Sequence, residues 1–435
     1  MERFALSRMK EWKENENRKP LIIRGARQVG KTWIMKTFGQ QYFEKTAYVN
    51  FDNNARMKQV FEGDLDIERL VLAISAETGV SIEAENTLII FDEIQEVPKA
   101  LTSLKYFHEN APQYAIVAAG SLLGVALHQG TSFPVGKVDF LDLYPLNFRE
   151  FLCAMGEKQF VSMLDSCDTQ MVTVFKTKYI ERLREYYFVG GMPEVVKDFS
   201  EKKDYNRVRA IQKNLINYYQ QDFSKHAEIK LVPRLNLVWN SIPMQLAKEN
   251  KKYIYGQVRK GSRAKDFELA IQWLLDCGLI HKVQRIQKPD LPLKAYIDFD
   301  AFKLFLVDIG LLIAMTDLDA KVIIEGNKIF TEFKGSLTEQ YILQQLISDV
   351  GVIPYYYSTQ NSKGEIDFLV QGKTSVIPIE VKAEENLKAK SLKAFCEKYQ
   401  PSYAVRTSMS DYREQDWMTN IPLYAIKWIE NYVNQ

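Results

Sequence analysis

The sequence predicts an α/β protein whose first part is a parallel sheet, and two observations support this fold class. Short apolar runs of the length of buried strands recur at 21–23, 47–51, 88–91 and 114–121, with helical segments between them. Glycine-rich or acidic residues directly follow the strands at 21–23 and 88–91. Strands that alternate with helices are typical of parallel sheets, in which the carboxyl ends of the strands line the ligand crevice.

The first of these strand ends carries a phosphate-binding pattern. The segment Pro20–Thr32, PLIIRGARQVGKT, fits G-x-x-x-x-G-K-[ST], the Walker A loop or P-loop. Two glycines allow a tight turn whose N–H groups face a polyphosphate, and the start of the helix that follows favours negative charge. We expect the lysine to contact the β- and γ-phosphates of ATP and the threonine to bind Mg²⁺. The predicted nucleotide-binding residues here are Gly25, Ala26, Arg27, Gln28, Val29, Gly30, Lys31 and Thr32.

The strand at 88–91 ends in Asp92 and Glu93, which predicts a Walker B element. We expect Asp92, together with Thr32, to hold Mg²⁺ and so to belong to the nucleotide site. The adjoining Glu93 is the expected catalytic residue, which orients or deprotonates the attacking water. An acidic strand end alone is a weak signal, but downstream of a Walker A loop it is a strong one.

The strand YAIVAAGS ends at Ser121, which we place in the nucleotide site, where it would sense the γ-phosphate or the attacking water. An equally good interpretation makes Ser121 the N-cap of a helix over LLGVALHQG. Further along, Lys137 and Arg149 are candidate cations for transition-state charge, although most such side chains are simply solvated.

Composition and length restrict the kind of protein. A chain of 435 residues predicts two to four domains, and its hydrophobic content of 46% is enough for ordinary cores. Four widely spaced cysteines favour reduced thiols over a disulfide framework or a zinc site. The charged N-terminus, with its short amphipathic helix, does not resemble a signal peptide, and no apolar run is long enough to cross a membrane. We therefore expect a cytoplasmic protein without a membrane partner.

Local charge is concentrated in residues 202–265, which carry fifteen Lys and Arg against four acids, a net charge of +11 in a chain whose formal net charge is +2. Such a segment suggests DNA or RNA as a partner. The stretch that begins at Gly261, GSRAKDFELAIQWLLDCGLIHKVQRI, has the rhythm of a winged helix, with a helix capped by Ser262 and ended by Gly278 before a wing strand. Winged helices contact DNA, and they also serve as protein–protein modules.

The last part of the chain carries a second set of chemically suggestive residues. Glu339 lies on a predicted helix, Asp367 in the strand EIDFLV, and Glu380 and Lys382 in the strand VIPIEVK. Residues two apart on a strand project from the same face. Metal-dependent cleavage of a phosphodiester needs two carboxylates for Mg²⁺, here Asp367 and Glu380, with a lysine to stabilise charge. The alternative is an amphipathic strand pair with solvated acids.

Seven motifs follow one another along nearly the whole chain: GARQVGKT, LIIFDE, AAGS, YPLNFREF, VGGMPEVV, KAYIDF…VDIGL and GEIDFLV…IPIEVK. In combination they resemble the prokaryotic family of AAA-type ATPases whose C-terminal half is a domain of unknown function with a restriction-endonuclease-like core. The resemblance implies ATP hydrolysis through Lys31, Thr32, Asp92 and Glu93. It also implies that Glu339, Asp367, Glu380 and Lys382 occupy the endonuclease-like positions. This chain has Gly136-Lys137 where the family commonly has Gly-Arg, so it lacks the bidentate fork of arginine there.

We therefore predict four parts: a P-loop AAA-type ATPase domain (1–150), a helical lid (151–225), a basic winged-helix-like module (226–295) and an α/β restriction-endonuclease-like domain (296–435). The leading functional hypothesis is an ATP-dependent molecular switch that acts on nucleic acid. One alternative is an ATP-gated, metal-dependent nuclease whose catalytic residues are Glu339, Asp367, Glu380 and Lys382. Another is a regulatory ATPase whose C-terminal domain is an inactive, protein-binding scaffold. The sequence leaves open whether the chain forms an oligomer.

Overall fold

The computed structural model describes residues 1–121, 123–126, 133–248, 251–324, 331–359, 364–385 and 389–435. It divides into two compact units. The N-terminal unit comprises Glu2–Tyr144 together with Asp276–Leu279, and the C-terminal unit comprises Met1, Pro145–Leu275 and Ile280–Gln435. In the described part of the chain, no helix combines the length and the apolar character that a bilayer crossing needs.

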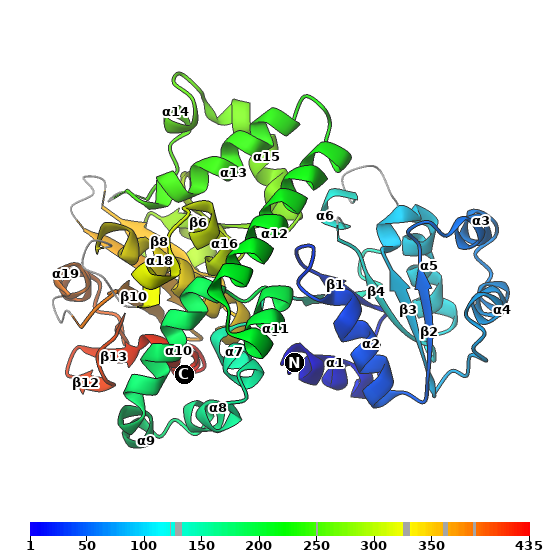
Figure 1. Ribbon diagram of the computed structural model, residues 1–435, viewed down its shortest axis with the longest axis horizontal. Helices are drawn as coiled ribbons and strands as arrows, with labels where there is room; N and C mark the ends of the chain where they lie inside the picture. Colours follow the sequence, from blue (N-terminus) through cyan, green and yellow to red (C-terminus); the bar gives the residue numbers. More distant parts are fainter. Residues whose placement is uncertain (122, 127–132, 249–250, 325–330, 360–363, 386–388) are drawn as a thin grey trace. The chain divides into compact units, whose positions relative to one another are not determined.

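The N-terminal unit alternates strands and helices (Figure 1). Its elements in chain order are α1 (Ala5–Glu14), β1 (Leu21–Arg24), α2 (Lys31–Tyr42), β2 (Lys45–Asn50), α3 (Ala55–Glu62), α4 (Ile67–Thr78), β3 (Thr87–Asp92), η1 (Ile94–Glu96), α5 (Pro98–Asn110), β4 (Ala115–Ala119), α6 (Leu123–Ala126) and β5 (Asp139–Asp142). The sheet order is β2-β3-β4-β1-β5, and every neighbouring pair is parallel. The predicted parallel sheet is thus confirmed.

Burial of the strands explains why these short runs form this sheet. Strands β3 and β4 are buried along their whole length, as expected for a parallel sheet with helices on its faces. Three phenylalanines, Phe51, Phe61 and Phe91, meet edge to face with ring centroids 5.3–5.7 Å apart. The expected amphipathic N-terminal helix is α1, which buries Met9 and Trp12.

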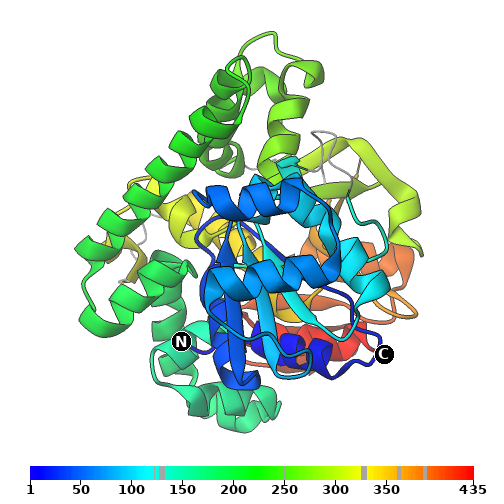
Figure 2. The same ribbon diagram turned by 90° about the vertical axis from the view of Figure 1, so that its right-hand side faces the viewer.

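The C-terminal unit begins with helices and ends with a mixed sheet. Its elements are α7 (Phe148–Ala154), α8 (Lys158–Asp165), α9 (Thr169–Val174), α10 (Lys176–Val189), α11 (Pro193–Lys202), α12 (Tyr205–His226), α13 (Val232–Leu246), α14 (Tyr255–Val258), α15 (Ala264–Asp276), β6 (Ile280–Ile286), η3 (Leu293–Tyr296), β7 (Ile297–Leu306), α16 (Ile309–Met315), α17 (Ala320–Ile324), α18 (Thr331–Gln345), η5 (Leu346–Val350), β8 (Tyr355–Ser358), β9 (Glu365–Gln371), β10 (Val376–Val381), α19 (Lys390–Tyr399), β11 (Val405–Ser408), β12 (Arg413–Gln415), β13 (Met418–Pro422), η6 (Leu423–Ile429) and α20 (Glu430–Val433). The long helix α12 stands out in green in Figure 2.

The sheet of the C-terminal unit has the order β12-β13-β11-β10-β9-β8-β6-β7. The helices α13, α14 and α15 and the antiparallel hairpin β6–β7 follow one another in the order that the expected winged-helix-like module requires. However, β6 also pairs in parallel with β8, so this hairpin continues the sheet of the last part of the chain. The winged-helix-like and endonuclease-like assignments and the four-part division remain predictions.

Close backbone packing explains the motif VGGMPEVV. A Cβ atom on Gly190 would lie 2.2 Å from Oδ1 of Asp308, and one on Gly191 would lie 2.1 Å from the carbonyl oxygen of Leu146. A Cβ atom on Gly310, in the motif VDIGL, would lie 2.6 Å from the carbonyl oxygen of Val189. Larger residues would therefore push these segments apart, because backbone atoms cannot yield as a flexible side chain can.

A buried carboxylate, Asp308, fixes the same crossing. Its side chain accepts hydrogen bonds from the N–H groups of Gly191 at 2.6 Å and Leu311 at 3.1 Å, and it caps α16. Gln344 of α18 donates to Asp308 at 3.3 Å and to the hydroxyl of Tyr186 at 2.9 Å. Burial raises the pKa of Asp308 to about 6, and the hydrogen bonds from backbone N–H groups and from Gln344 oppose this rise. This network joins α10, α16 and α18.

The raised pKa of Asp308 predicts a specific pH dependence of stability. The folded protein holds the Asp308 proton more tightly than the unfolded chain does. The contribution of this group to the free energy of unfolding therefore falls as pH rises from about 4 to about 6. A pKa change of this size corresponds to about 3 kcal/mol. We expect the free energy of unfolding of the wild type, measured by urea denaturation relative to Asp308→Asn, to decrease across this interval. A constant difference between the two proteins would contradict the assignment.

Candidate functional site

The loop between β1 and α2 has the backbone geometry that its sequence predicts. Gly25 has a φ of 148° and Gly30 a φ of 96°, and Gln28 also lies in the left-handed region at 68°. A Cβ atom on Gly25 would lie 2.1 Å from the carbonyl oxygen of Leu143, so only glycine fits there. Ala26 and Val29 are buried and anchor the loop, whereas Gln28 is exposed and Arg27 is half-buried.

Lys31 is buried at the start of α2, with its ammonium group held against the loop. Its Nζ atom donates to the carbonyl oxygens of Gly25 at 2.9 Å and Ala26 at 2.8 Å. Burial lowers the pKa of Lys31 to about 8, and the negative charges of Glu93 and Asp92 oppose this change. The lysine is therefore a desolvated cation at the loop, able to contact phosphate oxygens.

Asp92, at the end of β3, is the point where the predicted Walker A and Walker B elements meet. Its Oδ2 atom accepts hydrogen bonds from the hydroxyl of Thr32 at 2.7 Å and from the hydroxyl of Tyr48 at 2.9 Å. The Asp92 side chain is buried. A threonine hydroxyl and a carboxylate this close together form an oxygen donor set that suits Mg²⁺. The residues present thus fit the ion that the motif implies.

Glu93 is held in an unusual backbone conformation beside Asp92. Its φ of 51° and ψ of 44° place it in the left-handed region, which is uncommon for a residue with a side chain. Its carboxylate accepts hydrogen bonds from Gln95 Nε2 at 2.7 Å, Ser121 Oγ at 2.9 Å and Ser121 N at 3.2 Å. Burial acts to raise the pKa of Glu93, but these hydrogen bonds and the charge of Lys31 lower it overall.

Ser121 lies beside Glu93, and its assignment to the nucleotide site remains a prediction. Its hydroxyl donates to Glu93, and part of the helix that it was expected to cap lies outside the described residues. Tyr48 and Gln95 were not predicted from the sequence. The sequence did give a reason to consider Gln95. It follows Glu93 by two residues in a tight turn, so its side chain can reach the Glu93 carboxylate. Tyr48 depends on the pairing of β2 with β3, which no local pattern reveals.

The two candidate cations have structural partners. Lys137 forms an ion pair with Glu109 at 2.9 Å in the N-terminal unit. Arg149 belongs to the C-terminal unit, where it pairs with Asp349 at 2.8 Å and with Asp165. Both side chains are therefore engaged in ion pairs within their own units.

In the C-terminal unit, Glu339 and Asp367 form one half of the predicted acidic cluster. Glu339 is buried on α18, where it pairs with Lys251 and lies 3.6 Å from Nζ of Lys303. Lys303 on β7 is completely buried and also pairs with Glu365. Burial, followed by the charge of Glu339, raises the pKa of Asp367. Burial also acts to raise the pKa of Glu339, but the charges of Lys251 and Lys303 help to lower it overall. Neither lysine was predicted from the sequence to be part of this site.

Glu380 and Lys382 form the other half. Their side chains pair at 2.6 Å, as their spacing on a strand predicted. The second oxygen of Glu380 accepts the N–H of Leu392 in the first turn of α19 at 2.9 Å. The two halves are linked through Val381, whose N–H donates to Asp367 at 2.7 Å.

This arrangement is an ion-paired cluster. Within the residues that the structure describes, no group of three or more His, Cys, Asp or Glu side chains is placed to hold a metal ion. Each predicted ligand instead has a partner from the protein: Asp367 has a backbone N–H, and Glu380 has a lysine and a backbone N–H. The assignment of Asp367 and Glu380 as metal ligands therefore remains a prediction.

Ion pairs with acids from other segments neutralise part of the positive charge of the basic segment 202–265. Several basic side chains in the described part of the segment pair with acids outside it. These pairs are Lys202 and Arg207 with Asp198, Lys213 with Asp317, and Lys251 with Glu339. By contrast, Arg259, Lys260, Arg263 and Lys265 are exposed around the turn before α15, and they form no ion pair with the described residues. This turn is thus one cluster of unpaired positive charge in the described part of the segment, in which Lys225, Lys230 and Arg234 are also exposed.

Comparison with solved structures gives distant similarities. The chain is 15% identical to the Walker-type ATPase PABY2304 of Pyrococcus abyssi, with 72% of this chain and 95% of that chain covered and a TM-score of 0.44. The ORC1 protein of Aeropyrum pernix, solved in complex with DNA, is 13% identical, with 72% and 91% covered and a TM-score of 0.27. The Thermotoga maritima RuvB Holliday junction branch migration motor is 12% identical, with 64% and 87% covered and a TM-score of 0.28. At these values the similarities support no inference about ligands.

A comparison with curated proteins gave no match. Three family models match successive parts of the chain. Residues 180–322 match a domain of unknown function (DUF8612), and residues 334–426 match another (DUF4143). Residues 17–152 match the AAA domain. This match agrees with the parallel sheet and the Walker A and Walker B geometry described above, and these residues form an AAA-type P-loop domain.

Proposed function

We propose that the protein binds Mg·ATP and hydrolyses it, and that it acts as an ATP-dependent switch on nucleic acid. The observation that carries the first part is the 2.7 Å hydrogen bond between Thr32 and Asp92, beside the buried Lys31. This hydrogen bond joins the start of α2, which follows the loop after β1, to the end of β3, which is distant in sequence. The two residues lie next to a loop whose backbone suits phosphates.

Each residue has a distinct role in this proposal. Backbone N–H groups of the loop bind the phosphate oxygens, and Lys31 exchanges its contacts with two loop carbonyls for contacts with the β- and γ-phosphates. Thr32 and Asp92 would hold Mg²⁺, which neutralises phosphate charge when bound. Glu93 orients the attacking water and accepts its proton.

The contacts of Glu93 support a switch. Three hydrogen bonds from Gln95 and Ser121 occupy its carboxylate, which makes it a weaker base. To accept a proton from water, Glu93 must give up some of these bonds. Hydrolysis would then depend on a rearrangement just beyond the end of β4, where Ser121 lies.

Two substitutions test the role of Glu93. We expect Glu93→Gln to bind ATP normally and to lower kcat by about 10²–10⁴-fold, because it loses the general base. We expect Ser121→Ala to raise the pKa of Glu93, because it removes a hydrogen bond that lowers this pKa. The decrease in kcat that accompanies protonation of Glu93 at low pH should then occur at a higher pH. Steady-state ATP turnover measured between pH 4 and 8 checks both. Wild-type turnover in Glu93→Gln would rule out the assignment.

Exposed charge supports nucleic acid as the partner. Arg259, Lys260 and Arg263 lie on the turn before α15 and have no ion-pair partner among the described residues. Exposed lysines and arginines clustered in this way are what a phosphate backbone attracts. This part of the proposal depends on charge and on the order of helices and hairpin, and it is independent of the nucleotide site.

DNA binding at this turn can be tested with charge-matched variants. We expect the triple substitution Arg259→Ala, Lys260→Ala and Arg263→Ala to weaken binding of a fluorescent 20-base-pair duplex. The slope of log affinity against log salt should fall by about 0.9 for each phosphate that the variant no longer neutralises. Fluorescence anisotropy at several salt concentrations measures both. The control removes three basic residues that are already paired with acids: Lys202→Ala, Arg207→Ala and Lys213→Ala. Equal losses of affinity in both variants would remove the support for this turn.

The same duplex separates the alternatives for the C-terminal unit. Lys251 and Lys303 pair with Glu339, which favours an inactive scaffold over a metal-dependent nuclease. The wild type should therefore leave the DNA intact in Mg²⁺ or Mn²⁺. Cleavage that is lost in Asp367→Asn and Lys382→Ala, with ATP turnover unchanged, would instead support the nuclease.

A further inference from the structure

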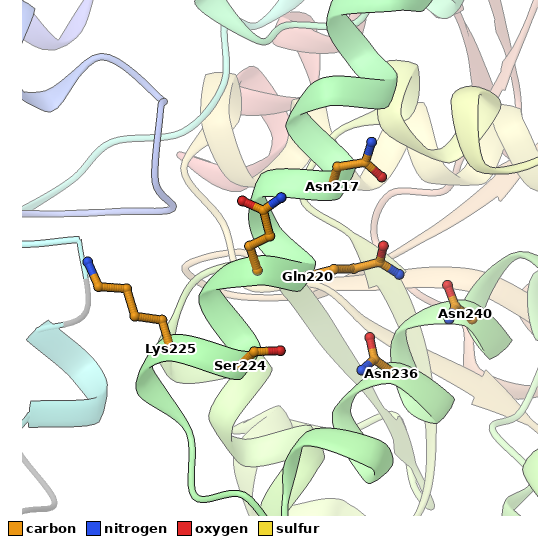
Figure 3. A pocket seen from close by; sticks show the side chains of 7 residues that line it. Asn217, Gln220, Ser224, Lys225, Asn236 and Asn240 are labelled. Atoms are coloured by element: carbon orange, nitrogen blue, oxygen red, sulfur yellow. The ribbon is translucent and has the colours of Figure 1, made fainter.

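A polar groove lies between α12 and α13 in the C-terminal unit, and none of its lining residues belongs to either site described above. Its volume is about 780 Å³, and it is largely open to solvent. Figure 3 shows side chains from both helices around it. Its lining consists of five carboxamides, one hydroxyl and one ammonium group: Asn217, Gln220, Gln221, Asn236, Asn240, Ser224 and Lys225.

The apolar faces of the two helices pack against each other and form the support beneath this groove. The ring of Trp239 on α13 lies 6.1 Å from Tyr219 and 5.9 Å from Phe223, both on α12. All three side chains are buried. Packing of these faces fixes the distance between the helices and thus holds the two rows of amides in place.

The amides are available for a ligand. Asn236 donates to the carbonyl oxygen of Val232 in its own helix. The side chains of Asn217, Gln220, Gln221 and Asn240 have no hydrogen-bond partner within the described ranges. A carboxamide carries both a donor and an acceptor, so the groove matches a ligand that offers both in alternation.

The charge and the side-chain types of the lining do not suit a nucleic-acid strand. Single-stranded nucleic acids bind to aromatic platforms beside several cations. The lining contains no aromatic residue, and its single cation, Lys225, points away from α13 in Figure 3. A polyanion would therefore lose its hydration without compensating charge.

The spacing of the amides fits an extended polypeptide. Asn217 and Gln221 on α12, and Asn236 and Asn240 on α13, are each four residues apart, which is about 6 Å along a helix. An extended chain repeats every two residues, or about 6.6 Å, and presents one N–H and one C=O per residue. The side-chain amides of one helix can thus hydrogen-bond to main-chain groups two residues apart on one edge of an extended peptide.

We propose that the groove between α12 and α13 binds an extended segment of a partner protein through its main chain. The amides of both helices hydrogen-bond the N–H and C=O groups of this segment. The site goes beyond the nucleotide and nucleic-acid functions proposed above, and its occupancy requires neither ATP nor DNA.

A phage-displayed library of random decapeptides provides the probe. The full-length wild type should enrich peptides, and a fluorescein-labelled synthetic copy should bind in anisotropy titrations. The double variant Gln221→Glu and Asn240→Asp keeps the side-chain shapes but removes two donors, and it should weaken binding by about tenfold or more. The control Asn214→Asp changes an exposed residue of α12 outside the lining. Circular dichroism and thermal unfolding verify that all variants fold.

Main-chain recognition gives a second readout. N-methylation of alternate peptide residues should abolish binding, whereas alanine substitution of single side chains should change it little. The proposal is overturned if no enriched peptide loses affinity in the double variant, or if side chains alone determine affinity. It is also overturned if an oligothymidylate binds the wild type and loses affinity in the double variant while peptides do not.

Discussion

The hydrogen bond from Thr32 to Asp92 depends on one constraint, the strand order of the N-terminal sheet. Strand β4 lies between β1 and β3, so the ends of three strands meet at one edge. Strand β1 leads into the phosphate loop, and β3 ends at Asp92. Strand β4 leads to Ser121, which reaches Glu93. The proposed chemistry would be impossible with any of these strands displaced, because its residues come from three separate parts of the chain.

The C-terminal unit depends on buried polar contacts of a different kind. Helix α18 carries a row of glutamines that bond to backbone groups of neighbouring elements. Gln340 bonds to both backbone groups of Leu306, and Gln344 accepts the N–H of Ile309. Glu339 on the same helix pairs with lysines. The polar residues of this helix thus organise the unit, and the acidic cluster is part of that organisation. The desolvation cost of a buried ion pair can exceed the attraction between its charges, so such a pair is weak evidence for stability.

Local patterns predicted the elements that carry the proposed nucleotide site. The turn at Gly25 and Gly30, the start of α2 and the acidic end of β3 each follow from a few neighbouring residues. The contact of Ser121 with Glu93 could not be predicted, because it depends on which strand lies beside which. The same holds for Lys303 on β7, which meets Glu339 on the distant helix α18.

The basic segment shows a related limit of prediction from sequence. Counting charges along the chain gave a strongly positive stretch, but acids from other segments neutralise part of it. Asp198 and Asp317 lie outside the counted window and pair with residues inside it. The motif VGGMPEVV was informative as a resemblance, yet its physical reason, the close approach of three backbone segments, became apparent only in the structure.

The most direct test of the proposed magnesium site is the effect of Mg²⁺ on ATP affinity, measured by titration with a fluorescent ATP analogue in Mg²⁺ and in EDTA. We expect Mg²⁺ to tighten binding to the wild type and to the control Asp64→Asn, whose side chain is exposed. We expect this dependence to be lost in Asp92→Asn, because the carboxylate beside Thr32 no longer carries a charge. The same Mg²⁺ dependence in Asp92→Asn and in the wild type would contradict the assignment of Asp92 and Thr32 to a magnesium site.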